Sequence, residues 1–382
     1  MTYKRQFAGT LREVGAGTRF EYHDGWNETI ACSLPVSKRD HYWPTGLFPF
    51  FEHLAPEGWL RARQARAARA SDQDDLGLLL RFGADCIGAV GVRPPGGLPE
   101  PGTDGDALEA AVTTPGRTLS GVQRKLLAHR ADSGGFVPSH QLADPATHIA
   151  KLNAIDRPTL VQNEALSLGL AREVLGSAEI TEASIGAVAG IDGIALLVER
   201  FDRVGENQLR LEDFAQILGR PHGRDFNGKY NGSYEEAAGV VAAHSARARI
   251  DLDRFFRLVV FNFVIGNADA HLKNFSLLER PEGLRLSPAY DLVSTLLYDF
   301  DPETGLEIGG RKRPIDTLDR GIVEAFGAEI GLPPAAVRRA LDQLGQRFAK
   351  AKTPALPERI EPTDFRLRYR DLVTRLATKI LA

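Results

Sequence analysis

A chain of 382 residues is too long for one compact core and is expected to form two or three units. Its apolar fraction of 43% and charged fraction of 25% are typical of globular proteins, and its net charge of −3 provides no general attraction to nucleic acid. The first residues lack an apolar signal core, and no apolar stretch is long enough to span a membrane. Cys32 and Cys86 lie in apolar sequence and are expected to be buried thiols. We therefore expect a cytoplasmic protein that does not bind membranes.

Residues 1 to about 92 are expected to form a first unit with mixed α/β structure. Its predicted elements are strands over 20–22, 30–33 and 87–90, a helix rich in alanine and arginine after Trp59, and a helix over 76–82. Residues 93–117 contain several prolines and glycines, which predicts a linker. The first unit contains no phosphate-binding or metal-binding constellation. We therefore expect a chain that begins near residue 110 to keep its functional site.

From residue 118 to about 201 the pattern predicts strands and one helix. The strands are expected over 125–129, 148–152, 180–188 and 195–201, and the helix over 163–172. A turn at 190–193 should pair the last two strands. Beyond residue 202 the chain is predicted to be mainly helical. Helices are expected near 211–219, 233–247, 251–265, 316–330, 334–350 and 364–381.

The most informative segment follows the apolar helix predicted over 251–265. Gly266 should end that helix, and a short hairpin is expected over 275–286. Asp269 and Asn274 have the spacing of a protein-kinase catalytic loop, and Asp291 follows the hairpin. All three should therefore lie at one end of the hairpin. In phosphoryl transfer from ATP, one carboxylate accepts the hydroxyl proton, while an amide oxygen and a second carboxylate hold magnesium on the phosphates.

A polar surface loop with ordinary turn chemistry is the alternative interpretation of this segment. The string G-N-x-D-x-H-x-K-N-F-S-L-L followed by P-x-Y-D-L-V-S is much rarer than D-x-x-x-x-N alone, and it favours the catalytic interpretation. Within the loop, we interpret Lys273 as a residue that neutralises phosphate charge. We interpret His271 as structural and Asn267 as a residue that orients the loop.

These motifs resemble those of the HipA family, the kinase toxins of bacterial toxin–antitoxin modules. Segments 266–278 and 287–295 resemble the catalytic and metal-binding loops of that family, and 198–203 resembles its hinge. The strand 148–152 resembles its phosphate-lysine strand, and 118–125 resembles its phosphate loop. The resemblance covers nearly the whole chain.

The resemblance implies an α+β fold of the two-lobed, protein-kinase-like type. The small lobe would be 118–201, the helical large lobe 202–382, and the N-terminal α/β subdomain 1–92, with the linker 93–117 between them.

The resemblance also implies roles for particular residues. Asp269 would be the catalytic base, and Asn274 and Asp291 would be the magnesium ligands. ATP would be bound by Lys151, Glu199, Phe201, Gly121, Val122, Gln123 and Lys273. Thr118 and Ser120 would be the candidates for autophosphorylation. The chain departs from many members at Leu211, where they carry a polar residue, often glutamine.

The implied function is an ATP- and magnesium-dependent serine/threonine protein kinase that acts as a toxin. Its substrate would be a translation component such as an aminoacyl-tRNA synthetase. Its partner would be a small, HipB-like helix-turn-helix antitoxin. The protein would then associate with DNA only indirectly, through the antitoxin. Two alternatives are a small-molecule kinase of the aminoglycoside-phosphotransferase type and a degenerate kinase that acts as a binding module in a repressor complex. The N-terminal subdomain argues against the first alternative, and the intact Asp–Asn–Asp triplet argues against the second.

Overall fold

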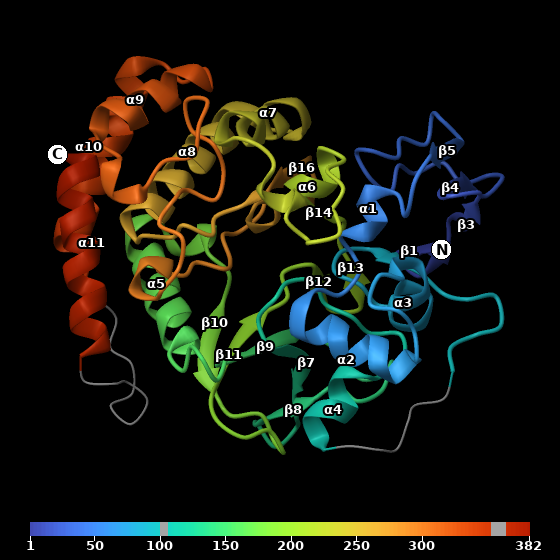
Figure 1. Ribbon diagram of the computed structural model, residues 1–382. Coiled ribbons are helices and arrows are strands. Elements are labelled where there is room, and N and C mark those ends of the chain that lie inside the picture. The colour runs from blue at the N-terminus through green and yellow to red at the C-terminus, as the bar shows by residue number, and fades with distance from the viewer. Residues whose placement is uncertain (100–105, 353–363) are drawn as a thin grey trace. The chain divides into compact units, whose positions relative to one another are not determined.

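The computed structural model describes residues 1–99, 106–352 and 364–382, which Figure 1 shows coloured along the chain. The chain forms two compact units, each made of two stretches. Unit 1 consists of Met1–Ala154 and Ser184–Lys229, and unit 2 consists of Ile155–Ala183 and Tyr230–Ala382. None of the helices in these described ranges combines the length and apolar character that a membrane crossing requires.

The first part of unit 1 contains short antiparallel strands and three helices. The elements are β1 (Thr2–Tyr3), β2 (Gln6–Phe7), β3 (Gly9–Val14), β4 (Gly17–Tyr22), β5 (Asp40–Trp43), α1 (Pro49–Glu52), α2 (Gly58–Ala68), α3 (Asp75–Phe82) and β6 (Val90–Gly91). One sheet has the order β2, β1, β6, and another has the order β3, β4, β5. Tyr3, Phe20 and Phe51 belong to the apolar core that these elements share.

The strand predicted over 30–33 is wrong. These residues form a turn with a single bridge between Ala31 and Leu34. The backbone N–H of Ile30 donates to the Tyr22 hydroxyl at 3.2 Å. A side chain therefore satisfies this backbone group, and the apolar residues are buried at a turn instead of alternating across a sheet.

The strand predicted over 87–90 is shorter than expected and is limited to β6. Gly88 has a φ of +80°, which an extended strand does not tolerate. Its N–H donates to Oδ2 of Asp202 at 2.7 Å, so this backbone group is bound to a side chain instead of a neighbouring strand.

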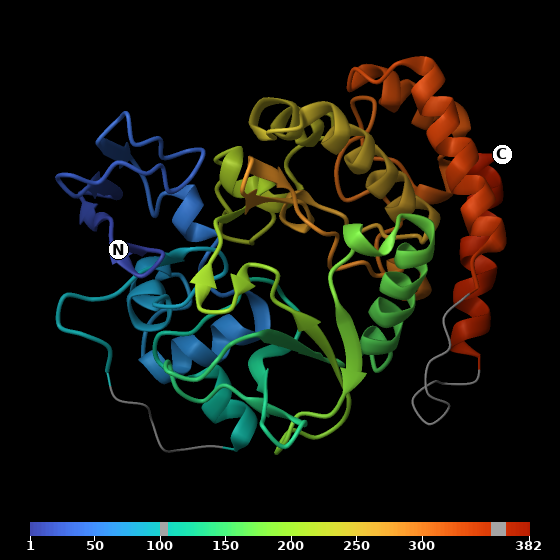
Figure 2. The same ribbon diagram turned by 180° about the vertical axis from the view of Figure 1, so that it is seen from behind.

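The larger sheet of unit 1 has five strands in the order β10, β11, β9, β7, β8 (Figure 2). They are β7 (Lys125–Arg130), β8 (Phe136–Pro138), β9 (His148–Leu152), β10 (Ala183–Gly186) and β11 (Ala195–Glu199). Strand β9 is central and runs antiparallel to both β7 and β11. All four strands predicted in this region are present, and β8 is an additional strand.

Helices α2 and α4 (Ala107–Val112) contribute to the core of this sheet. Leu60 from α2 and Val112 from α4 are buried with side chains of β7, β9 and β11. The segment predicted as a linker, 93–117, thus contains a helix that packs on the sheet, while its residues 100–105 lie outside the described residues. Because α2 belongs to the first 92 residues, removing them would open this core, contrary to our expectation from sequence.

Residues 211–219, predicted as one helix, form a strand followed by a single helical turn. The strand is β14 (Leu211–Asp213), and the turn is α6 (Phe214–Ile217). Asp213 begins the helix, because its carboxylate accepts the N–H of Gln216 at 2.8 Å while the Gln216 side chain accepts the N–H of Asp213 at 2.9 Å. This reciprocal capping box is a helix start signal, and it separates the strand from the helix. Two further strands of unit 1 precede them, β12 (Arg203–Val204) and β13 (Asn207–Gln208).

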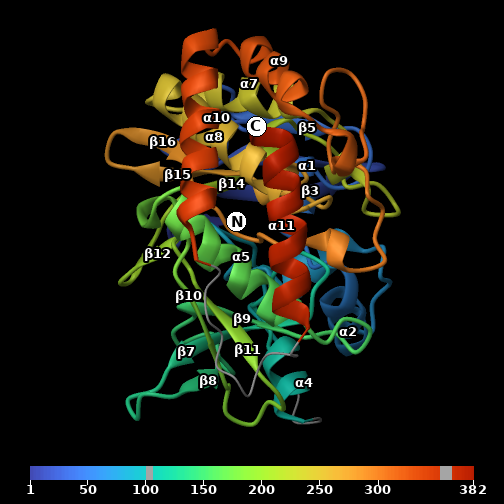
Figure 3. The same cartoon turned by 90° about the vertical axis from the view of Figure 1, so that its left-hand side faces the viewer.

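Unit 2 is mainly helical and contains one hairpin. Its elements are α5 (Leu160–Val174), α7 (Tyr234–His244), α8 (Ala248–Val264), β15 (Ser276–Arg280), β16 (Gly283–Leu286), α9 (Arg320–Glu329), α10 (Pro334–Lys350) and α11 (Phe365–Leu381). Helices α10 and α11 lie side by side, next to α5 (Figure 3). The helices predicted beyond residue 230 are present, because their apolar faces repeat at helical spacing over many turns.

The core of unit 2 is built on helix α8. Phe255, Phe256 and Phe263 are fully buried, and their rings contact aromatic rings of neighbouring elements. Phe255 contacts Phe275 at the start of the hairpin, with ring centroids 5.0 Å apart. Large aromatic side chains contribute much of the burial energy of such a core. Helix α8 is therefore a fixed support for the loop that follows it.

The hairpin is also attached to α8 through a buried carboxylate. Asp251 is 0% exposed, and its carboxylate accepts hydrogen bonds from the Arg285 guanidinium at 2.8 and 2.9 Å and from the backbone N–H of Leu286 at 3.0 Å. Burial alone would raise the pKa of Asp251, but the hydrogen bonds from Arg285, Ser245 and the backbone hold it well below its usual value. The carboxylate is therefore ionised, and it fixes the end of β16 against the helix.

Candidate active site

The loop after α8 begins at a glycine whose conformation the chain requires. Gly266 has a φ of +70°, and a Cβ at this position would lie 3.2 Å from the Leu296 side chain. The glycine therefore ends the helix as predicted, without strain and without a clash.

Asn267 connects the helix to the candidate base. Its amide nitrogen donates to Oδ1 of Asn262 at 2.7 Å, and its amide oxygen accepts the backbone N–H of Asp269 at 3.1 Å. Asn262 and Asn267 are both 2% exposed, so these bonds form away from water. They fix the backbone of Asp269 relative to α8, in agreement with the orienting role that the sequence suggested for Asn267.

Asn274 and Asp291 are in direct contact at the end of the hairpin. The Asn274 amide nitrogen donates to Oδ2 of Asp291 at 2.8 Å, and its amide oxygen accepts the backbone N–H of His271 at 2.9 Å. Asp291 has a φ of +59°, in the left-handed region that residues other than glycine seldom adopt. Such a conformation costs about 1–3 kcal/mol and persists where the surroundings impose it, often at functional sites.

The hairpin brings these two residues together. Strands β15 and β16 pair antiparallel, with Leu277 opposite Leu286, so the residues before β15 and after β16 lie at the same end. The Tyr290 hydroxyl donates to the backbone oxygen of Lys273 at 2.8 Å and closes this end. The predicted arrangement of Asn274 and Asp291 is thus present, and Lys273 belongs to the same closed end.

Asp269 has a neighbour that the sequence did not suggest. The Tyr230 hydroxyl donates to Oδ1 of Asp269 at 2.5 Å. Thirty-nine residues separate the two, and no periodicity or motif connects them. Tyr230 ends a short 3-10 helix, and a tyrosine there is more often a surface or core residue than a partner of a catalytic carboxylate, so only the folded chain reveals this contact.

The donor set in unit 2 fits magnesium. Asn274 carries an amide oxygen and Asp291 a carboxylate; the Asn274 atom that faces Asp291 is the amide nitrogen, while the amide oxygen accepts the His271 N–H. Both are hard oxygen ligands, and Mg²⁺ usually takes only one or two ligands from protein and the rest from water and phosphates. Asn274 and Asp291 would hold the ion.

The remaining predicted residues lie in unit 1. Lys151 is 8% exposed in the central strand β9, opposite Leu196 of β11 and Lys125 of β7. Glu199 is the last residue of β11, and Phe201 lies two residues beyond it. Buried lysines are rare and are usually paired with an anionic group, and phosphate is one such group.

The predicted phosphate loop, residues 118–125, is attached to unit 1 at several points. Gly121 has a φ of +102°, which favours glycine, while the Val122 side chain is 59% exposed. The Gln123 amide nitrogen donates to the backbone oxygen of Leu152 at the end of β9, at 3.2 Å. This bond fixes the loop next to the strand that carries Lys151.

The two hydroxyl residues of this loop have different environments. Thr118 is 2% exposed, and its hydroxyl donates to the Gln64 side-chain oxygen at 3.0 Å. Ser120 is partly exposed, and its hydroxyl donates to the Glu57 carboxylate at 2.9 Å. Glu57 also pairs with Lys229, whose ammonium lies 3.3 Å from the other carboxylate oxygen.

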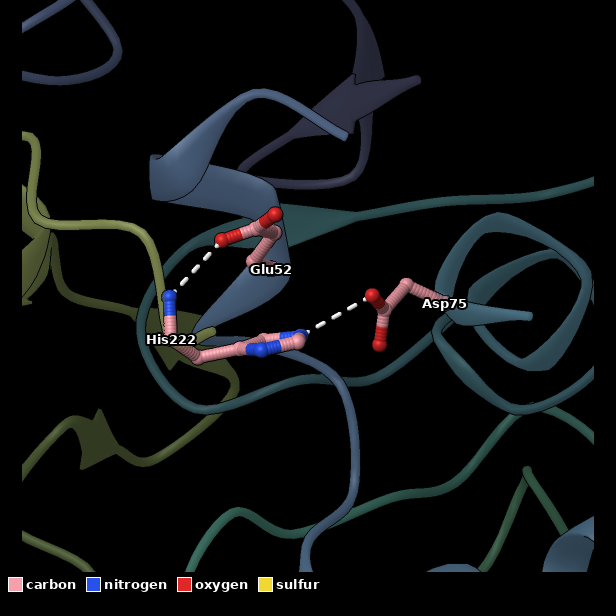
Figure 4. A group of neighbouring side chains, drawn as sticks. All are labelled: Glu52, Asp75 and His222. Atoms are coloured by element: carbon pink, nitrogen blue, oxygen red, sulfur yellow. Dashed lines mark hydrogen bonds and ion pairs between the residues drawn. The ribbon is translucent and has the colours of Figure 1, made fainter. Parts of the chain in front are cut away.

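A separate charged group in unit 1 was not predicted. Glu52, Asp75 and His222 come from α1, α3 and the segment after α6, and their potential ligand atoms lie within 4.8 Å of one another (Figure 4). Nε2 of His222 lies 2.9 Å from Asp75, and the His222 backbone N–H donates to Glu52 at 3.0 Å. The Arg61 guanidinium lies 2.8 Å from the other Asp75 oxygen. Asp75 is paired with both Arg61 and His222, and Glu52 accepts the His222 backbone N–H, so we interpret this group as a structural ion-pair and hydrogen-bond network.

The protonation of this network should make unit 1 sensitive to pH. Burial lowers the pKa of His222, but the hydrogen bond and charge of Asp75, with the charge of Glu52, outweigh it and raise the pKa above 6.5. Burial likewise raises the pKa of Asp75, but His222 and Arg61 outweigh it and the pKa is lowered. The pair therefore stabilises the folded protein fully at pH values below the usual histidine pKa, as long as Asp75 is ionised. This stabilisation is lost as the pH rises through the raised pKa of His222.

We therefore expect His222→Gln to lower the thermal midpoint more at about pH 6 than at about pH 8.5, since the imidazolium exists mainly at the lower pH. The measurement is thermal unfolding of both proteins across that range. His244→Gln is the control, because His244 ends α7 and lies outside this network. An equal loss at both pH values would contradict the assignment of a charged His222–Asp75 pair.

Comparison with known proteins defines the class. Residues 117–352 match the HipA-like C-terminal domain, and residues 1–93 match the HipA N-terminal domain. Two candidate kinases of Sinorhizobium fredii are similar. Y4mE is 29% identical over a region that covers 89% of this chain and 87% of Y4mE. Y4dM is 31% identical over a region that covers 78% of this chain and 75% of Y4dM. The serine/threonine-protein kinase toxin HipA of Shewanella oneidensis is 27% identical, covering 79% of this chain and 75% of its own.

A solved structure of Shewanella oneidensis HipA, in complex with HipB and its operator DNA, has the same fold. It matches with a TM-score of 0.74 and 23% identity, covering 99% of this chain and 96% of that one. The fold is thus the α+β fold of a HipA kinase, as the sequence predicted. The chain belongs to the HipA family. The predicted enzyme class, that of serine/threonine protein kinases, is confirmed through these relatives.

Proposed function

We propose that this protein is an ATP- and magnesium-dependent kinase that phosphorylates serine or threonine in another protein and acts as the toxin of a toxin–antitoxin pair. The observation that supports this most is the contact between Asn274, on the same loop as Asp269, and Asp291, which follows the hairpin. These are the acid, amide and carboxylate groups that phosphoryl transfer from ATP requires.

Each of these side-chain groups has one role in the proposed reaction. The Asp269 carboxylate accepts the proton of the substrate hydroxyl, whose oxygen forms the new bond to the γ-phosphorus. The bond from that phosphorus to the bridging oxygen breaks, and the electron pair leaves with ADP. Magnesium, when bound, offsets the negative charge of the phosphates. Asn274 and Asp291 would hold the ion, and Lys273 adds a positive charge at the same end of the hairpin.

The nucleotide contacts are proposed from the family. Lys151 would bind phosphates, and the backbone of Gly121, Val122 and Gln123 would cover them. The backbone of Glu199 and Phe201 would bind adenine. The position of Lys151 in the central strand β9, beside the loop that Gln123 fixes to the end of that strand, supports its part of the assignment.

The partners are proposed from the relatives. The structure of Shewanella oneidensis HipA contains HipB and operator DNA. We propose that this chain binds a HipB-like helix-turn-helix antitoxin and that DNA is bound by the antitoxin. Its protein substrate would be a translation component such as an aminoacyl-tRNA synthetase.

Incubation of the purified protein with γ-labelled ATP and magnesium tests the activity. We expect label to be transferred to protein, both to the kinase itself and to a component of a translation extract. Asp269→Ala protein should transfer none. If wild-type protein transfers no label to any protein, the proposed function is wrong.

Autophosphorylation should occur at Ser120 and not at Thr118. Thr118 is buried with its hydroxyl bound to Gln64, whereas Ser120 is partly exposed. A phosphate adds a charge of about −2, and on Ser120 it would face the Glu57 carboxylate, now 2.9 Å from the hydroxyl. Repulsion should displace the loop and weaken ATP binding.

Mass spectrometry of protein incubated with Mg-ATP should locate the phosphate on Ser120. Ser120→Ala protein should remain unmodified in this peptide and should keep its ATP affinity. Phosphate on Thr118, or unchanged affinity after modification of Ser120, would contradict this mechanism.

A further inference from the structure

Tyr230 is hydrogen-bonded to one oxygen of the Asp269 carboxylate, the candidate base. Its hydroxyl donates to Oδ1 of Asp269 at 2.5 Å. In the described part of the chain, the other carboxylate oxygen, Oδ2, has no hydrogen-bond partner. A hydrogen bond to a carboxylate is stronger than one between neutral groups, and it holds the side chain in one rotamer. The carboxylate is thus anchored through one oxygen and available through the other.

Two residues hold the Tyr230 ring in place. His271, on the same loop as Asp269, contacts the ring edge-on, with centroids 5.0 Å apart and planes at 72°. The Lys312 ammonium lies over the ring, 5.3 Å from its centroid. Edge-to-face packing and a cation over the ring are both favourable for an aromatic side chain. They restrict the ring, and therefore the direction in which the hydroxyl points.

A hydroxyl on the base can either position it or block it. Blocking would require Tyr230 to occupy the oxygen that receives the substrate proton. Only Oδ1 is occupied, and a carboxylate accepts protons at either oxygen. The geometry therefore favours positioning over blocking.

We propose that Tyr230 is a positioning residue for phosphoryl transfer, which holds the Asp269 carboxylate through Oδ1 and leaves Oδ2 for the substrate hydroxyl. This rests on the proposed function. The serine or threonine proton passes to Oδ2 as the hydroxyl oxygen bonds to the γ-phosphorus and ADP leaves. Tyr230 keeps its own proton and donates to Oδ1 throughout. Lys312 contacts the Tyr230 ring, so its effect on the reaction is indirect.

Steady-state kinetics of Tyr230→Phe, which removes only the hydroxyl, tests this role. We expect kcat to fall about 10- to 100-fold, because a freely rotating carboxylate is seldom in the reactive position, while KM for ATP changes less than about twofold. Lys312→Met should lower kcat by a smaller factor, since the hydroxyl remains.

Tyr234→Phe is the matched control. The Tyr234 hydroxyl donates to the backbone oxygen of Ala270 at 3.0 Å, so it contacts the same loop without contacting the base. We expect this variant to retain kcat within about threefold of wild type. A comparable fall in both variants would assign the effect to loop stability and would overturn the positioning role.

A second measurement does not depend on activity. Thermal unfolding of wild type, Tyr230→Phe, Asp269→Ala and the double variant forms a mutant cycle. If the hydrogen bond exists, the shift in the double variant should differ clearly from the sum of the single shifts. Additive shifts would overturn the contact.

The outcomes separate the two proposals. If wild type is active and Tyr230→Phe has unchanged or higher kcat, only the positioning role is overturned. If wild type transfers no phosphate at all, the proposed function is overturned, and the positioning role with it, whatever the mutant cycle shows about the contact.

Discussion

Asp269→Asn protein is expected to bind ATP normally and to lose phosphoryl transfer by a factor of about 10²–10⁴. The substitution preserves the size of the side chain and its ability to accept the Tyr230 hydrogen bond. It removes the negative charge and the basicity that the hydroxyl proton needs. Binding is retained because Asp269 is not one of the two residues proposed to hold magnesium.

Asp291→Asn is expected to give the opposite pattern, with loss of magnesium-dependent ATP binding. A neutral amide is a weaker ligand than a carboxylate for a hard divalent ion. Calorimetric titration of ATP with and without magnesium, combined with transfer of label from γ-labelled ATP, separates the two variants.

Asp253→Asn is a suitable control for both substitutions. Asp253 lies in α8, in the same unit, where its side chain is 38% exposed and pairs with Arg257. This variant should match wild type in both assays, because exposed ion pairs contribute little. Full activity in Asp269→Asn, or unchanged magnesium-dependent binding in Asp291→Asn, would refute the corresponding role.

Deletion of residues 1–92 should prevent unit 1 from folding, although the sequence suggested that this part was dispensable. Leu60 of α2 is 2% exposed in the core of the five-stranded sheet. The Gln64 amide nitrogen donates to the backbone oxygens of Val112 and Arg117, both at 2.9 Å. Removing α2 exposes an apolar core and leaves buried carbonyl groups without partners, and each such group costs about 1–3 kcal/mol.

Circular dichroism and thermal unfolding of a chain that begins at residue 93 test this expectation. We expect loss of a cooperative transition and of ATP binding. Leu60→Ala in the full chain should lower stability by about 2–5 kcal/mol through the cavity it leaves. Leu367→Ala is the control, since Leu367 is 51% exposed. A shortened chain that unfolds cooperatively and binds ATP would show that the first 92 residues are an independent domain.

The parts of the site that are close along the chain could be predicted from the amino-acid sequence. Asp269, Asn274 and Asp291 are connected by one hairpin, so local turn chemistry is sufficient to place Asn274 next to Asp291. The long helices could also be predicted from the sequence, because an amphipathic face repeated over several turns specifies a helix largely independently of distant residues. The order of the motifs was also sufficient to indicate the family.

The contacts between distant segments became visible only in the folded chain. Tyr230 reaches Asp269 across 39 positions, and His222 meets Asp75 across 147. No periodicity encodes such pairs, because they depend on how whole elements pack. The same reason explains why α2 was predicted to belong to a separate domain. Its apolar residues indicate a buried face, but which core buries that face is decided only when the chain folds.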